Sequence, residues 1–82
     1  MNVTDESGWT PLIYAALGGH NTLTLALLNA GAKVNATNDS GSTALMKAAQ
    51  NGHSETLDIL LSRGASLSMT NSKGYSAMVL AA

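Results

Sequence analysis

Two histidines are the side chains of this sequence that first suggest chemistry. His20 and His53 lie 33 residues apart, and each follows a glycine, Gly19 or Gly52. An imidazole exchanges protons near neutral pH, so it suits acid–base catalysis and metal binding. A zinc site would need further ligands, but the sequence has no cysteine and no repeated carboxylate beside the histidines. We therefore expect both histidines to brace a turn, and we predict no metal site and no cofactor.

The five acidic residues form no pair that the sequence places across a cleft, as general acid–base catalysis would require. Cysteine is absent, so a thiolate nucleophile and disulfide bonds are excluded as well. The glycines match neither the dinucleotide-binding nor the phosphate-binding loop motif. We therefore predict no catalytic residue and no enzyme activity, and we assign solvent-exposed positions to Asp5, Glu6, Asp39, Glu55 and Asp58.

The charge of the chain is small. Four basic and five acidic residues leave a net charge of -1, which attracts neither nucleic acid nor an anionic membrane over distance. No apolar run approaches the roughly 20 residues that cross a bilayer, and the N-terminus lacks a signal-peptide pattern. We expect a soluble, intracellular and cytoplasmic protein that binds no nucleic acid and does not insert into a membrane.

Three asparagines, Asn2, Asn35 and Asn38, lie in Asn-x-Ser/Thr sequences. In a secreted protein these sequences would accept N-linked glycans. Two of the three, Asn35 and Asn38, lie at an expected turn, where the asparagine side chain has a structural use. We favour the structural interpretation.

A 33-residue repeat organises the chain, because residues 5–37 and 38–70 are identical at 13 positions spread along the unit. Residues 1–4 align with the end of a unit, and residues 71–82 align with the start of another. We therefore divide 1–82 into the end of a preceding unit (1–4), repeat 1 (5–37), repeat 2 (38–70) and a truncated repeat 3 (71–82). We expect further repeats in the full-length chain, because stacked units stabilise one another.

Each unit predicts two short helices joined by a turn. In repeat 1 the first helix begins at Pro11, after Thr10 as its N-cap, and runs to about Leu17. The second helix begins near Asn21, and its counterpart in repeat 2 near Ser54. Adjacent alanines in the first helices let the backbones approach closely. We expect the larger apolar contacts from Leu12, Leu45 and Met78 in the first helices, and from Leu23, Leu27, Leu28, Leu57, Leu60 and Leu61 in the second.

The runs GWTPLIYAALGGH at 8–20 and GSTALMKAAQNGH at 41–53, followed by LLNAGAKVNAT and LLSRGASLSMT, closely resemble the ankyrin repeat family. The resemblance implies an all-α ankyrin-repeat solenoid of stacked antiparallel helix pairs with β-hairpin-like finger turns. It also implies recognition of a protein partner through the finger tips and the first-helix face. The histidine that usually follows TPL in this family is replaced by Ile13, Met46 and Val79, so its hydrogen-bond network should be absent.

The family's contact positions, transferred residue by residue, give a candidate protein-binding surface. Trp9 and Tyr75 stand out on it, because Trp and Tyr are enriched at binding hot spots, although each could instead pack on the neighbouring finger. Tyr14, Lys47 and Arg63 are weaker candidates. The predicted protein-binding residues are Glu6, Ser7, Trp9, Leu17, Asp39, Ser40, Ser42, Gln50, Asn51, Ser72, Lys73 and Tyr75.

Two functions fit this surface. The chain can be a protein–protein interaction module of a scaffold or adaptor that holds one protein partner. It can also be the substrate-recognition or regulatory segment of a larger enzyme or ligase complex whose catalytic part lies outside these residues. The sequence of the neighbouring domains would separate the two.

Overall fold

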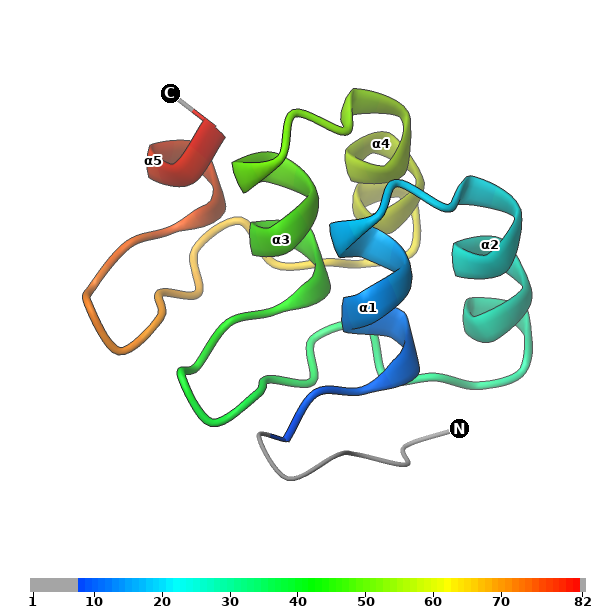
Figure 1. Ribbon diagram of the computed structural model, residues 1–82, viewed down its shortest axis with the longest axis horizontal. Coiled ribbons are helices and arrows are strands. Elements are labelled where there is room, and N and C mark those ends of the chain that lie inside the picture. Colours follow the sequence, from blue (N-terminus) through cyan, green and yellow to red (C-terminus); the bar gives the residue numbers. More distant parts are fainter. Residues whose placement is uncertain (1–7, 82) are drawn as a thin grey trace.

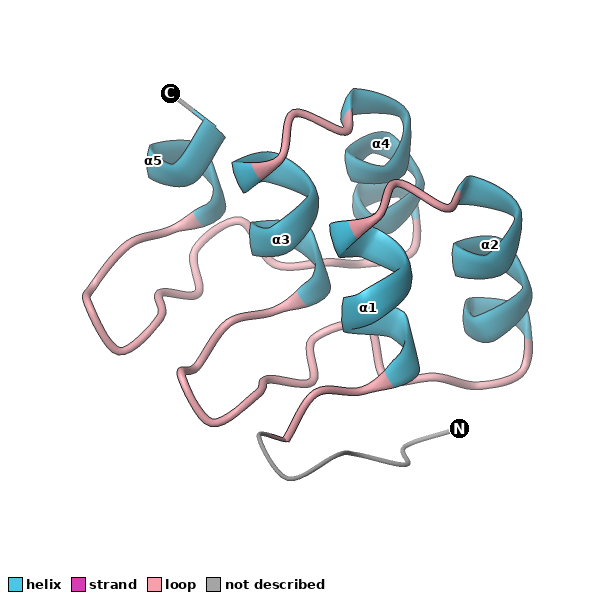
Figure 2. Ribbon diagram, viewed as in Figure 1, coloured by secondary structure: helices cyan, strands magenta, loops and turns pink. Residues whose placement is uncertain are grey.

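The computed structural model describes residues 8–81, in which the chain forms five short α-helices and no strand. As Figure 1 shows, α1, α3 and α5 stand in one layer, with α2 and α4 in a second layer to their right. The long loops between successive helix pairs project beyond one end of the helices, and the short turns within each pair lie at the other end (Figure 2). The stack is therefore the predicted all-α array of helix pairs, built from α1 (Pro11–Leu17), α2 (Asn21–Asn29), α3 (Ala44–Gln50), α4 (Ser54–Ser62) and α5 (Ala77–Ala81).

Threonine caps start α1 and α3 in the first layer. The Thr10 hydroxyl accepts a hydrogen bond from the backbone N–H of Ile13 at 3.2 Å, and Pro11 follows at the first helical position. The Thr43 hydroxyl accepts from the N–H of Met46 at 3.3 Å in the same way. Each hydroxyl satisfies one of the N–H groups that have no partner within the helix. The predicted start of the first helix is confirmed.

Replacing the Thr43 cap should destabilise the fold measurably. Thr43 is buried, so Thr43→Ala leaves the Met46 N–H without its acceptor and without water. We expect the free energy of unfolding in urea to fall by about 1 kcal/mol. Thr37→Ala, at an exposed loop position, is the matched control and should leave the transition nearly unchanged. Equal midpoints for the two variants would show that the cap contributes nothing.

The second-layer helices pack the predicted leucines on the core, except Leu23. Leu27 and Leu60 are buried as expected, but Leu23 is 49% exposed and Thr24 is fully buried. Thr24 takes the inward position near the start of α2, where its hydroxyl donates to the His20 carbonyl at 2.8 Å and is satisfied without water. The expected apolar stripe was therefore wrong at Leu23 by one residue.

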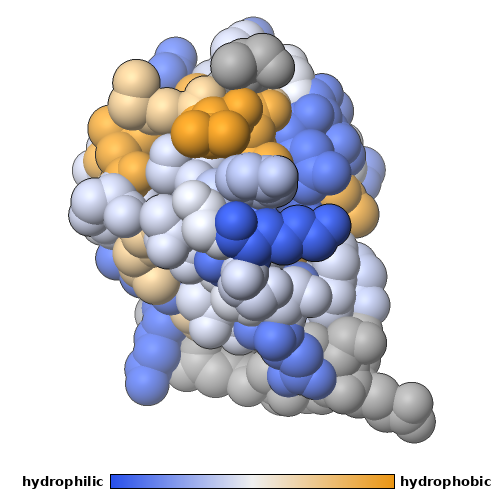
Figure 3. Space-filling view, turned by 90° about the vertical axis from the view of Figure 1, so that its left-hand side faces the viewer, coloured by the Kyte–Doolittle hydropathy of each residue, from blue (hydrophilic) through white to orange (hydrophobic). Residues whose placement is uncertain are grey.

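The core lies between the two layers and along the first layer. The alanine pairs of α1 and α3 are buried, and so are Leu12 and Leu45, which have α2 or α4 packed against their own helix. The prediction that Met78 packs in the core was wrong, because Met78 is 68% exposed on α5. Its neighbour Val79 is 55% exposed. Figure 3 faces this end of the stack and shows apolar atoms gathered in its upper part, where α5 lies. No described helix follows α5 to cover them.

Candidate functional site

An asparagine side chain folds each of the two described loops between helix pairs. In the α2–α3 loop the Asn38 Oδ1 accepts hydrogen bonds from the backbone N–H groups of Ser40 and Ser42, both at 2.9 Å. In the α4–α5 loop the Asn71 Oδ1 accepts from those of Lys73 at 2.9 Å and Tyr75 at 3.0 Å. The loops are thereby closed into hairpin-like turns, with a single β-bridge between Thr70 and Ser76 in the second.

The two loops are also fastened to the stack and to each other. The Ser72 N–H donates to the Ser40 carbonyl at 2.8 Å. The Asn35 side chain accepts from the Ser66 N–H at 2.8 Å and donates to the Gly64 carbonyl at 3.3 Å. Together with the buried Asn38, these bonds confirm the structural use that we expected for the asparagines at this turn.

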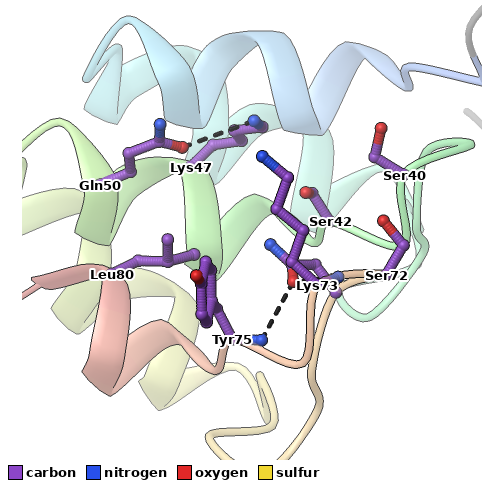
Figure 4. Close-up of a pocket in the computed structure, with 9 residues that line it drawn as sticks. Ser40, Ser42, Lys47, Gln50, Ser72, Lys73, Tyr75 and Leu80 are labelled. Atoms are coloured by element: carbon purple, nitrogen blue, oxygen red, sulfur yellow. Dashed lines mark hydrogen bonds between the residues drawn. The ribbon is translucent and has the colours of Figure 1, made fainter.

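A groove of ≈ 310 Å³ lies where the two loops meet the helices α3 and α5 (Figure 4). One side carries Lys47 and Gln50 from α3, and the other carries Tyr75 from the loop before α5 and Leu80 from α5 itself. We call it the α3–α5 groove; its lining residues are Ser40, Ser42, Lys47, Gln50, Asn71, Ser72, Lys73, Tyr75 and Leu80.

The repeat register explains why the chain is hollow at this place. Position 9 of the sequence recurs at 42 and 75, so the small Ser42 stands between two units that carry Trp9 and Tyr75. Ser42 is only 4% exposed and forms the floor of the groove, whereas Tyr75 is 45% exposed at its edge. A serine in place of an aromatic residue thus opens room for a side chain from outside.

On the other side of Lys47, an aromatic cluster closes the surface. The rings of Trp9 and Tyr14 lie 4.9 Å apart between centroids and are tilted by 33°. The Lys47 Nζ lies 5.1 Å from the centroid of the Trp9 ring, within range of a cation–π interaction. Trp9 is half-buried, and its ring stabilises the position of Lys47.

A hydrogen-bonded seam joins the helix pairs behind this surface. The Leu17 carbonyl accepts from the Asn51 Nδ2 at 2.9 Å and from the His53 Nε2 at 2.9 Å. The Asn21 side chain donates to Glu55 at 2.9 Å and accepts from the hydroxyl of Thr56. The expectation that the histidine braces a turn is confirmed for His53; His20 makes no side-chain hydrogen bond to its helix end.

The predicted binding residues divide by location. Gln50, Ser72, Lys73 and Tyr75 are exposed and line the α3–α5 groove, as does the exposed Ser40. Of the other predicted positions, Ser42 alone also lines the groove. Leu17 and Asn51 belong to the seam, Ser42 is buried in the floor, Asp39 is exposed beside Gly8, Trp9 lies in the aromatic cluster, and Glu6 and Ser7 lie outside the described residues.

Three groove residues were absent from the predicted set or ranked low in it. Lys47 was a weaker candidate, and Leu80 and Asn71 were not named. Lys47 and Leu80 occupy the repeat position of Tyr14, so the repeat register itself could have identified them. Asn71 repeats Asn38, whose place in the turn also follows from the register.

The described surface carries groups that can bind a partner, among them ammonium, hydroxyl, amide and aromatic side chains. Among residues 8–81, no three His, Asp or Glu side chains come together as a metal would require. None of the helices in this described part is long and apolar enough to cross a membrane. The geometry supports hydrogen bonding and packing against a bound chain.

Two comparisons with known proteins agree with this arrangement. A family model described as ankyrin repeats (3 copies) matches residues 1–71. The human protein named ankyrin repeat and SAM domain-containing protein 3 is 49% identical over 35 residues, which cover 43% of this chain and 5% of that relative's length. Ankyrin repeats are generally protein–protein interaction modules and form a non-catalytic fold. By its repeat period, its stacked helix pairs and this match, the chain belongs to the ankyrin repeat family.

Proposed function

We propose that the chain acts as a scaffold or adaptor segment that binds one protein partner in the α3–α5 groove. The observation that carries the proposal is the groove itself, with exposed Gln50, Ser72, Lys73 and Tyr75 around it. These side chains come from two successive repeats, so a bound peptide would cross the boundary between them.

The order of the surrounding backbone supports binding at this place. The Asn71 side chain holds the N–H groups of Lys73 and Tyr75, and the Ser72 N–H bonds to the Ser40 carbonyl. A loop that is already ordered loses little conformational entropy when a partner binds. The half-exposed Tyr75 ring adds a rigid, amphipathic contact of the kind enriched at binding hot spots.

Site-specific photocrosslinking tests the location. A benzoylphenylalanine residue replaces Ser72 in one variant and Ser62 in a control; both serines are exposed, but Ser62 lies on α4. In cells that naturally produce this protein, we expect the probe at position 72 to form a covalent adduct with a partner protein, and the probe at position 62 to form none. Equal labelling from the two positions, or labelling from position 62 alone, would contradict the proposed surface.

A further inference from the structure

We propose that the α3–α5 groove binds an acidic peptide segment, with a carboxylate between Lys47 and Lys73 and an adjacent apolar side chain against Tyr75 and Leu80. This inference rests on the proposed function, because it names the chemistry of the partner that the groove would hold.

The groove carries a local positive charge. The groove is lined by two lysines, Lys47 and Lys73, and by no aspartate or glutamate of the described chain. Residues 8–81 contain three side-chain carboxylates. Asp39 belongs to the α2–α3 loop but lies beside Gly8, Glu55 accepts a hydrogen bond from the Asn21 amide, and Asp58 is exposed on α4. The groove is thus locally positive although the whole chain carries a net charge of -1, and it favours an anionic ligand.

The groove lining is also rich in hydrogen-bond donors. The hydroxyls of Ser40, Ser42 and Ser72 line the groove together with the two ammonium groups. Ammonium groups only donate, and a hydroxyl can donate as well, so the lining suits a ligand rich in acceptors. A carboxylate is acceptor-only, and its hydrogen bonds to charged donors are stronger than those of a neutral amide.

Two contacts hold the Lys47 side chain in position. Its Nζ lies 5.1 Å from the Trp9 ring centroid and donates to the Gln50 Oε1 at 3.5 Å. These two contacts hold a flexible side chain at the groove, which lowers the entropy that a bound carboxylate would have to remove. Figure 4 shows Lys47 coming from α3 and Lys73 from the loop before α5.

Part of the groove lining is apolar. Tyr75 is 45% exposed and Leu80 is half-buried, and both belong to the same side of the groove. Because Ser42 replaces the aromatic residue found at positions 9 and 75, the floor leaves room for an apolar side chain beside the Tyr75 ring. A peptide that alternates an acidic with an apolar residue would satisfy both parts.

Selection from a displayed library of random 12-residue peptides on the full chain tests the inference. We expect Asp and Glu to be enriched over the unselected library, and the amide resonance of Tyr75 to shift on titration with a selected synthetic peptide. Lys47→Gln with Lys73→Gln should raise the Kd of the selected peptide by at least about tenfold at low salt. Lys33→Gln with Thr22→Glu changes the net charge equally at exposed positions outside the groove and should preserve the Kd.

Two further probes complete the test. The peptide remade with Asn and Gln in place of Asp and Glu should bind at least about tenfold more weakly. Ser42→Tyr, which restores the aromatic class of positions 9 and 75, should block binding while circular dichroism stays unchanged.

The outcomes separate the two proposals. Peptides that shift Tyr75 but show no acidic enrichment, or that bind equally as neutral versions, would overturn the acidic partner and leave the groove as a binding site. An equal loss of affinity in the groove double variant and in the charge-matched control variant would also overturn the acidic partner, since the net charge of the chain would then be responsible. Selected peptides that leave Tyr75 unshifted and bind Ser42→Tyr normally would overturn the proposed function itself.

Discussion

Leu45→Ala should lower the free energy of unfolding by about 2 to 5 kcal/mol, the largest loss that we expect from a single truncation in this chain. The Leu45 side chain is fully buried on α3, the helix that packs against α1, α4 and α5. Removing its methyl groups forfeits their burial and leaves a cavity that the short neighbouring helices can fill only in part. Urea unfolding followed by circular dichroism measures the change.

Leu23→Ala is the matched control for this truncation. It makes the same chemical change in a helix, but Leu23 is 49% exposed on α2. We expect a loss below about 1 kcal/mol, because little apolar area leaves the water when Leu23 folds into place. If the two truncations shifted the unfolding midpoint equally, the assignment of Leu45 to the core between the layers would be wrong.

The sequence predicted the helices well because their limits depend on near neighbours. The Thr10 cap, Pro11 and the turn after Leu17 act within a few residues, so their effect can be predicted without knowing the fold. Burial depends on what packs against the helix. Met78 is apolar and repeats Leu45, yet it is exposed, because no described helix covers α5 as α4 covers α3.

The candidate site was predictable residue by residue but not as a shape. Gln50, Lys73 and Tyr75 occupy positions that the family resemblance marks as contacts, and all three line the groove. The hollow itself depends on three units at once, since Ser42 becomes a floor only between Trp9 and Tyr75. The position of Trp9 depends on its contacts with Tyr14 and Lys47, which only the packed helices bring together.

Gly19→Ala should destabilise the chain more than Gly52→Ala, although the two glycines repeat each other. Their φ angles are +69° and +72°, so a Cβ costs each about 1 to 2 kcal/mol of backbone strain. At Gly19 the added Cβ would also lie 2.7 Å from the His53 Nδ1, whereas at Gly52 it would meet nothing within 4 Å. Only Gly19→Ala therefore forces the imidazole away from the Leu17 carbonyl.

The difference between the two alanine variants isolates the contact between repeats from the backbone strain. We expect Gly19→Ala to lose about 1 kcal/mol more than Gly52→Ala, the net value of a hydrogen bond such as that from His53 to the Leu17 carbonyl. In a His53→Ala background the two glycine substitutions should cost the same, because the clash and the bond are both gone. Urea unfolding of the six proteins gives this cycle. A persistent gap between the glycine variants without the imidazole would mean that something other than His53 makes Gly19 necessary.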